Sequence, residues 1–330
     1  ATFEHCIGPQ GIGVRIMKAE QIAIIGAGMA GLSCARQLAR SGHKLVIFDK
    51  GRGIGGRLAT RRTPDGLKFD HGAQYLTARG NEFRSLISKT CNAGAADLWD
   101  DGSGQERFVG VPGMNAIAKH LGDGLDIRTR AEVNGVCADG NGWSVSVGIQ
   151  THLFRHLVIT VPAPQACRLL GPDHPFVAEL GMVRIVPCLT LMAAFAPDQP
   201  KPFCVRCDAE DPIAWIAQNS TKPGRPEPTC WVAQAGSDWS NAHLERDLDE
   251  IVDLMLPMLC DRLGADQSAV LHAVAHRWRY AKTTVPLGQS FLRDDDGTLY
   301  LGGDWCLGAR VEAAWSSGAA IAEDPLKVAE

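Results

Sequence analysis

The pattern of residues 21–49 constrains the fold of this chain more than any other feature. Residues 21–25 (QIAII) form a short apolar run, typical of a strand buried on both faces of a parallel sheet. The run GAGMAG at 26–31 follows directly, a helical pattern comes next, and a second apolar run at 44–48 ends in Asp49. This βαβ unit predicts a parallel sheet of the Rossmann type.

The spacing of the glycines in this unit indicates a dinucleotide site. Gly26 permits a tight turn, Gly28 lets the backbone approach a pyrophosphate, and Gly31 allows the helix to pack closely on the strand. The helix begins near Met29 and Ala30, where free N–H groups and the positive end of the helix dipole favour phosphate. Asp49, 18 residues beyond Gly31, can accept hydrogen bonds from a ribose diol.

A second glycine cluster follows, in a chain whose 36 glycines among 330 residues exceed the average of about 7%. It runs from Lys50 through Arg52 and Gly56 to Arg57, and the stretch 44–62 holds six Lys or Arg and one acid. Positive charge beside glycine-rich backbone suits a diphosphate. The cluster resembles the R-x-G-G-R motif of flavin-dependent amine oxidases, and this resemblance implies FAD.

The carboxyl-terminal segment resembles the second FAD motif of the same superfamily. A strand at 298–301 precedes Gly303 and Asp304, and a helix is expected from Val311 to about residue 323. The resemblance implies that Asp304 contacts the ribityl chain and that the helix directs its amino terminus at the flavin pyrimidine ring. A helix dipole there would stabilise the negative charge that hydride transfer leaves on the ring.

Several further stretches resemble the renalase group within that superfamily. They are DHGAQYLT at 70–77, VPGM at 111–114, NSTKPGR at 219–225, HRWRYA at 276–281 and DWC at 304–306. The resemblance covers residues 17 to about 322. It implies that Ala73, Gln74 and Tyr75 lie against the flavin and that the backbone of Val133 contacts adenine. His71 and Gln234 depart from the pattern, where an apolar residue and a histidine are expected.

The resemblance implies an α/β fold, with a discontinuous Rossmann-type FAD-binding domain and an α+β substrate domain that has a mixed or antiparallel sheet, as in amine oxidases and p-hydroxybenzoate hydroxylase. The expected FAD domain comprises 17–83, 113–165 and 290–330, and the substrate domain 84–112 and 166–289, after an extension at 1–16. Within the second domain, strands are expected at 188–195 and 229–235, and an amphipathic helix at 241–263 with a kink at Pro257.

Renalases oxidise 2- and 6-dihydro isomers of NAD(P)H to NAD(P)⁺ and pass the electrons to O2, giving hydrogen peroxide. A dihydropyridine becomes aromatic by losing a hydride, so no catalytic residue beyond flavin N5 is needed. The expected substrate-binding residues are Tyr75, Asn219, Lys222, Arg225, His276, Trp278 and Tyr280. The last three share one face of a strand by period two, and Lys222 and Arg225 are candidates for the substrate's phosphates.

Two alternatives remain open at this stage, a true amine oxidase on the same fold and a non-enzymatic flavoprotein that senses redox state. Three tyrosines leave few rings for an aromatic amine cage. The Ser-Gly-Gly-Cys-Tyr segment that carries covalent flavin in monoamine oxidases is missing from the sequence, so non-covalent FAD is expected.

Composition excludes other classes of protein. A net charge of −4 gives no drive toward nucleic acid, and no apolar run reaches the length that a membrane span needs. Eleven scattered cysteines favour a reducing, cytoplasmic location, and translation is expected to start at Met17. The CxxC of Cys204 and Cys207 and the pair His152 and His156 lack partners for zinc, so no metal is expected.

Overall fold

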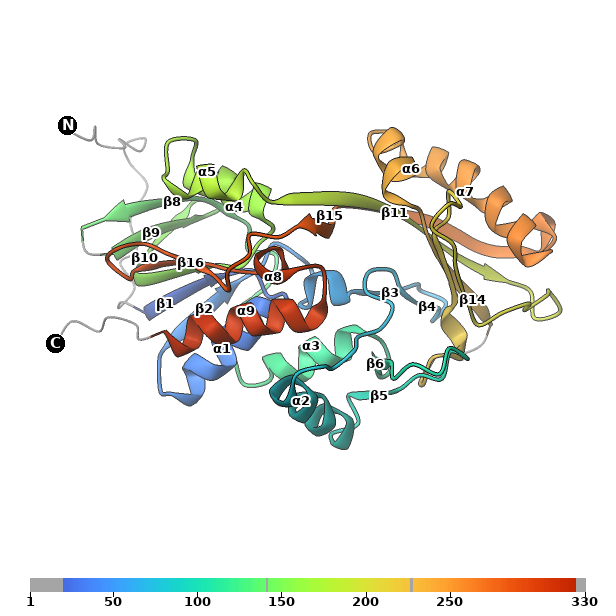
Figure 1. The fold of residues 1–330 in the computed structure, drawn as a ribbon, viewed down its shortest axis with the longest axis horizontal. Helices are drawn as coiled ribbons and strands as arrows, with labels where there is room; N and C mark the ends of the chain where they lie inside the picture. Colours follow the sequence, from blue (N-terminus) through green and yellow to red (C-terminus); the bar gives the residue numbers. More distant parts are fainter. Residues whose placement is uncertain (1–19, 141, 226–227, 325–330) are drawn as a thin grey trace.

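The structure is a computed structural model that describes residues 20–140, 142–225 and 228–324. The expected extension at 1–16 and the expected start at Met17 lie outside the described residues. Two large sheets lie side by side, one at each end of the long axis of the molecule (Figure 1). The expected mixed α/β fold with a Rossmann-like part is confirmed.

The first sheet contains the βαβ unit that the sequence predicts. Its order is β16 (Leu292–Arg293), β17 (Leu299–Leu301), β10 (Gln150–Ile159), β1 (Glu20–Ile25), β2 (Leu45–Phe48) and β7 (Ile127–Arg128). β1 pairs in parallel with β2 and β10, and β10 pairs in parallel with β17. The hairpin of β8 (Val133–Asp139) and β9 (Gly142–Val147) joins β10 in antiparallel fashion.

Both faces of the first sheet are covered, because alternate residues of β1 point into two separate cores. Ile22 and Ile24 pack toward α1 (Met29–Arg40), α3 (Asn115–Gly122) and α9 (Val311–Glu323), whereas Ala23 and Ile25 pack toward the hairpin and α4 (Ala163–Leu170). Figure 1 shows α1 and α9 below this sheet and α4 and α5 (Phe176–Leu180) above it. This alternation explains the continuous apolar run of β1.

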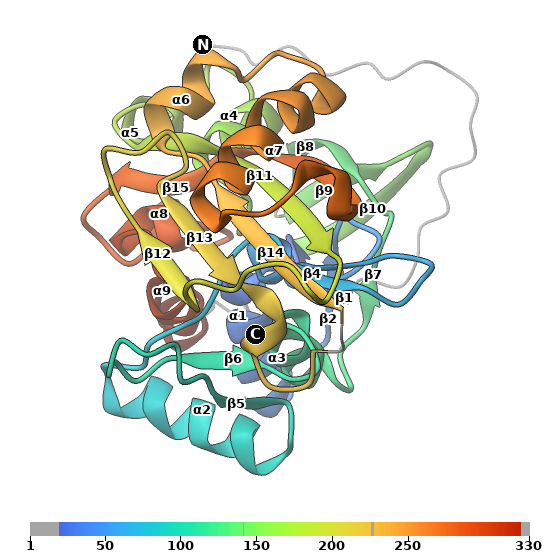
Figure 2. The same cartoon turned by 90° about the vertical axis from the view of Figure 1, so that its right-hand side faces the viewer.

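The second sheet is antiparallel and forms a platform beside the first. Its order is β12 (Val205–Cys207), β13 (Trp215–Gln218), β14 (Thr229–Gln234), β11 (Arg184–Phe195) and β15 (Val270–Val285). α6 (Ser237–Ala242) and α7 (Leu248–Leu263) lie against one face, through Leu189, Trp231 and Met255 (Figure 2). The expected single helix at 241–263 is wrong, because residues 243–247 separate α6 from α7 and Asp247 occupies the N-cap position of α7.

Smaller elements connect the two sheets. They are α2 (Asn81–Asn92), α8 (Asp304–Leu307), the hairpins β3 (Thr60–Arg62) with β4 (Lys68–Asp70) and β5 (Ala96–Leu98) with β6 (Phe108–Gly110), and the 3-10 turns η1 (Gly56–Leu58), η2 (Asn219–Thr221) and η3 (Gln267–Ala269). The division of the chain into two domains stays a prediction. Within the described residues, no helix is long and apolar enough to cross a membrane.

Candidate functional site

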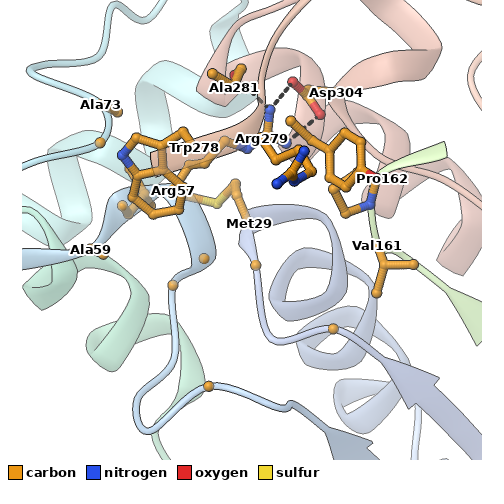
Figure 3. A pocket seen from close by; sticks show the side chains of 18 of the residues that line it. Met29, Arg57, Ala59, Ala73, Val161, Pro162, Trp278, Arg279, Ala281 and Asp304 are labelled. Atoms are coloured by element: carbon orange, nitrogen blue, oxygen red, sulfur yellow. Dashed lines mark hydrogen bonds and ion pairs between the residues drawn. The ribbon is translucent and has the colours of Figure 1, made fainter. Parts of the chain in front are cut away.

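A cavity of about 2090 Å³ lies where the carboxyl ends of β1, β2 and β10 face β15 of the second sheet (Figure 3). Most of the residues expected to bind the cofactor line it. These are Gly26, Gly28, Met29, Ala30, Asp49, Lys50, Arg52, Gly56, Arg57, Ala73, Val133, Gly303, Asp304 and Val311. A cavity outside the carboxyl ends of parallel strands is the usual ligand position in such sheets.

The amino terminus of α1 offers the cavity free backbone donors. Gly28 is the N-cap residue, no side chain caps the helix, and its first turn holds no acid. A Cβ on Gly28 would meet no heavy atom within 4 Å, whereas a Cβ on Gly31 would lie 1.9 Å from the carbonyl oxygen of Gly26. Gly31 therefore serves close packing and does not line the cavity, and Gly28 leaves room for a ligand phosphate at the helix end. The residues present fit a dinucleotide diphosphate.

Asp49 holds the two glycine loops together at the end of β2. One carboxylate oxygen accepts a hydrogen bond from the N–H of Ala27 at 2.7 Å, and the other accepts one from the N–H of Gly51 at 2.7 Å. Each oxygen keeps a second lone pair that a ribose hydroxyl can use. Asp49 thus fixes the shape of the diphosphate cradle and still lines the cavity.

Arg57 and Asp304 form an ion pair between segments 247 residues apart (Figure 3). The guanidinium donates to both carboxylate oxygens, at 2.8 and 2.6 Å, and also to the carbonyl oxygen of Ala281 at 3.0 Å. Arg57 follows the second glycine cluster, Asp304 begins α8, and Ala281 belongs to β15. The pair therefore joins the amino-terminal, carboxyl-terminal and substrate-side walls of the cavity.

The helix α9 brings its amino terminus to the cavity, where Val311 lies in the lining. Glu312 in its first turn points elsewhere and accepts hydrogen bonds from the N–H groups of Arg79 and Gly80, at 3.1 and 2.6 Å. α9 packs closely on α1, since a Cβ on Gly318 would lie 2.0 Å from the carbonyl oxygen of Ala30. Two helix amino termini thus border one cavity.

One wall of the cavity, formed by His71, His276 and Trp278, is aromatic and uncharged. The rings of His71 and Trp278 stack with centroids 5.3 Å apart, and His276 meets both rings edge-on, at 4.7 and 4.4 Å. The Trp278 indole N–H donates to the carbonyl oxygen of His71 at 2.7 Å, which fixes the cluster. Burial lowers the pKa of His276 to about 4 and also lowers the pKa of His71, so both imidazoles are neutral at pH 7.

The two departures from the family pattern meet at this wall. Gln234 on β14 donates from Nε2 to the carbonyl oxygen of Gly72 at 2.8 Å, next to His71. His71, Gly72 and Gln234 all line the cavity. Tyr280 also lines it, and its hydroxyl accepts a hydrogen bond from Arg168 at 3.0 Å. The expected row of His276, Trp278 and Tyr280 is thus brought to one cavity.

The remaining residues of the predicted substrate site lie elsewhere. Asn219, Lys222 and Arg225 do not line the cavity, and the side chains of Lys222 and Arg225 are 0% and 1% exposed beside Asp70. The expectation that these two cations reach the substrate's phosphates does not fit this placement, because Asp70 engages both in the core. Burial alone would raise the pKa of Asp70, but Lys222 and Arg225 outweigh it and hold that pKa below its usual value.

Gln74 and Tyr75 also lie outside the cavity lining. Gln74 is buried and donates to the backbone oxygen of Asp70, while its Oε1 accepts from Lys222 at 3.1 Å. The Tyr75 ring is covered by the Arg107 guanidinium, whose carbon lies 4.2 Å from the ring centroid. Of the stretch expected to contact flavin, Ala73 is the residue that reaches the cavity.

Arg61 of the basic stretch 44–62 lines the cavity, together with basic residues that the sequence interpretation missed, among them Arg130 and Arg168. Of the described residues that line it, eleven are Lys or Arg and three are Asp or Glu. No local motif marks these arginines; Arg168 lies at the end of α4, and Arg130 follows β7 with a positive φ of 55°. The cavity therefore favours an anionic ligand. Within the described residues, no cluster of three His, Cys, Asp or Glu could hold a metal.

Comparisons with known proteins agree with this geometry. Residues 24–90 match the model of the NAD(P)-binding Rossmann-like domain, and residues 90–324 match that of the flavin containing amine oxidoreductases. A flavin-containing monooxygenase of Arabidopsis thaliana, FMO GS-OX1, is 30% identical over 42% of this chain and 34% of its own length. A 4,4'-diapophytoene desaturase of Staphylococcus aureus is 44% identical over 16% of the chain and 10% of its own length. The chain thus matches about a third or less of these curated relatives.

Solved structures share the fold at low sequence identity. A putative protoporphyrinogen oxidase from Exiguobacterium sp. has a TM-score of 0.75 at 14% identity, covering 93% of this chain and 98% of that one. Cyclohexylamine oxidase from Brevibacterium oxydans has a TM-score of 0.66 at 15% identity, covering 93% and 99%. The family model spans most of the chain, and the cavity carries the features that a flavin dinucleotide needs. The chain therefore belongs to the flavin containing amine oxidoreductases, with FAD as its cofactor.

Proposed function

We propose that this protein is a renalase-like oxidase of 2-dihydro isomers of NAD(P)H, with the 6-dihydro isomers as alternative substrates. The substrate loses a hydride and becomes NAD(P)⁺. The hydride, a proton and O2 together give H2O2. Bound FAD would supply the acceptor for the hydride and the route by which the electron pair reaches O2. The enzyme would serve metabolite repair in a reducing cytoplasm, with which the eleven scattered cysteines of the sequence agree.

The observation that carries this proposal is the neutral aromatic wall of His71, His276 and Trp278. Oxidation of a dihydropyridine to an aromatic ring requires hydride loss without deprotonation of the substrate, so a wall that holds the ring is sufficient. The low pKa of His276, about 4, leaves that imidazole uncharged at neutral pH. Under this proposal, the aromatic wall positions the planar ring of the substrate and excludes water from it.

The charge of the cavity supports a dinucleotide substrate. Arg168 and Lys282 line the cavity together with the aromatic wall, whereas Arg277 and Arg279 of the same lining are engaged by the carbonyl oxygen of Arg246 and the carboxylate of Glu245. The three acids in the lining are Asp49, Glu132 and Asp304, and two of them are engaged by backbone N–H groups or by Arg57. Such a surface attracts a diphosphate and repels an alkylammonium ion.

Anaerobic stopped-flow mixing of the holoenzyme with 2-dihydro-NAD tests the proposal. We expect rapid loss of the flavin absorbance and formation of NAD⁺, followed in air by continued oxygen uptake with equimolar peroxide. A panel of primary and secondary amines is the comparison, because the family includes amine oxidases. Rapid reduction by an amine alone would overturn the proposal, and a single reduction without sustained oxygen uptake would favour the redox-sensing alternative.

A further inference from the structure

Two aromatic rings beside the cavity enclose a cation that belongs to the chain itself. The rings of Tyr75 and Trp215 have centroids 5.7 Å apart and an interplanar angle of 39°. The guanidinium carbon of Arg107 lies 4.2 Å from the Tyr75 centroid and 5.4 Å from the Trp215 centroid. Both distances fall within the range in which a cation is attracted to a ring face.

A buried carboxylate completes the surroundings of this cation. The side chain of Asp101 is 1% exposed and forms an ion pair with Arg107 through Oδ2, while its Oδ1 accepts hydrogen bonds from the backbone N–H and the hydroxyl of Ser103. The side chain of Arg107 is 13% exposed. The guanidinium thus has two aromatic rings and a buried carboxylate as neighbours, which is the set of groups that binds an organic cation.

This cluster adjoins the cavity through Trp215, which lines it, whereas Tyr75, Asp101 and Arg107 lie outside the lining. Trp215 on β13 pairs in register with Gln234 on β14, Gln234 with Thr190 on β11, and Thr190 with His276 on β15. Paired residues of an antiparallel sheet share a face, so Trp215 and His276 stand on the same side of the platform. Tyr75 lies two residues after Ala73, and Ala73 lines the cavity where the flavin is expected.

We propose that Tyr75, Trp215 and Asp101 form a cation-binding cage at the edge of the substrate cavity, and that Arg107 occupies it permanently. The ligand class of the empty cage is a guanidinium or primary ammonium ion. Arg107 thereby closes this edge of the cavity to an organic cation, because it fills the position in which the cage would hold one. This inference rests on the proposed function and deepens it, since it removes one site beside the cavity at which an amine could be held.

Chemical rescue of the holoenzyme variant Arg107→Ala tests the cage without any dihydronicotinamide. Loss of the guanidinium leaves Asp101 unpaired, and we expect the Tm to fall by about 5–10 °C. Millimolar methylguanidinium or ethylammonium should restore at least half of that loss. The same salts should leave the Tm of the wild type unchanged, and potassium chloride at equal ionic strength should not rescue the variant.

The double variant Arg107→Ala/Asp101→Asn and the variant Arg84→Ala are the controls. The double variant lacks the carboxylate and should show no rescue. Arg84 pairs with exposed Glu106 at 2.8 Å and donates to the carbonyl oxygen of Ala78 at 2.8 Å, so its loss should lower the Tm less than Arg107→Ala and should show no rescue by cations. If Arg107→Ala is insoluble, the soluble yield on refolding with and without methylguanidinium gives the same comparison. Absence of rescue, or equal rescue of the double variant, overturns the cage.

The effect on specificity has its own readout. Arg107→Ala should bind benzylamine with a change in the flavin absorbance that the wild type and Arg107→Lys do not show. Rescue by cations with no such change would confine Arg107 to a structural role and overturn the claim that it closes this edge of the cavity to an organic cation. Neither result depends on dihydro-NAD oxidation, so failure of the cage and failure of the proposed function are distinguishable.

Discussion

Lys222 and Arg225 lie in a closed cluster around Asp70, whereas Arg61 and Arg168 line an open cavity, although all four are basic residues in one acidic chain. In the cluster, the two cations are paired by a carboxylate that also accepts hydrogen bonds from Thr60 and the N–H of Met114. Among the described residues, no carboxylate forms an ion pair with Arg61 or Arg168, and Arg168 donates to the hydroxyl of Tyr280. The same residue type thus serves folding in one region and ligand attraction in the other.

The largest expected effect comes from breaking the closed cluster. Arg225→Met leaves Asp70 buried with Lys222 at 3.4 Å as its remaining ion-pair partner. We expect the free energy of unfolding to fall by about 3–5 kcal/mol, because Asp70 loses one of its two buried ion pairs and the carbonyl oxygens of Gly110 and Pro223 lose their donor. Urea unfolding of the holoenzyme, followed by circular dichroism, measures it.

Arg61→Met is the matched control in the open cavity. It should change the free energy of unfolding by no more than about 0.5 kcal/mol, since it removes a side chain without buried partners. If Arg225→Met unfolds like the wild type but raises KM, then Arg225 is a ligand residue and the contrast between the two regions fails.

The next largest effect is expected on KM, when a basic residue that lines the open cavity is removed. Under the proposed function, Arg168→Met removes a cation that can bind a substrate phosphate, and a charge-assisted hydrogen bond contributes about 1.5–3 kcal/mol. KM for 2-dihydro-NAD should rise about tenfold or more, with kcat little changed. Steady-state oxygen uptake measures both constants. Arg40→Met, at the exposed end of α1, should leave them unchanged, and an equal rise in that variant would indicate a general charge effect.

The βαβ unit and the glycine loops were predictable because their signals are local. Gly26, Gly31 and Asp49 act through spacing along one short segment, and the structure has the expected strands and helix there. The break in the expected helix 241–263 also had a local signal, since Asp247 is a good N-cap residue ahead of an apolar run. This signal was overlooked because apolar residues recur at helical spacing through the whole stretch 241–263.

The roles of Lys222 and Arg225 could not be predicted in the same way. Their partner Asp70 lies 152 and 155 residues earlier in the chain, and a motif does not show whether a side chain turns toward a cavity or into a core. Arg107 is a similar case, because its position between Tyr75 and Trp215 depends on three separate segments. Such placements depend on packing of distant elements rather than on spacing.

The aromatic wall should make the stability of the protein depend on pH, with an effect of intermediate size. The pKa of His276 is lowered from 6.5 to about 4 by burial, with smaller contributions from His71 and Arg61. Between these two pH values the unfolded chain binds a proton at this position that the folded chain does not, so stability falls as the pH falls from 6.5 to 4 and levels off below. Urea midpoints across this range should decrease less steeply for His276→Gln than for the wild type. Identical slopes would mean that His276 is not buried as a neutral ring.

The smallest expected effect is at the rim of the cavity, where the two kinds of environment meet. Tyr280→Phe removes the hydroxyl that accepts from Arg168 at 3.0 Å in an exposed position, but keeps the ring, 5.8 Å from the guanidinium carbon. Water replaces an exposed hydrogen bond with little loss, so the free energy of unfolding should change by less than about 0.5 kcal/mol. KM for 2-dihydro-NAD should rise less than in Arg168→Met, because the cation that attracts phosphate remains. If Tyr280→Phe instead matches Arg168→Met, the hydroxyl orients the guanidinium, and the rim is organised like the buried cluster rather than as an open surface of independent charges.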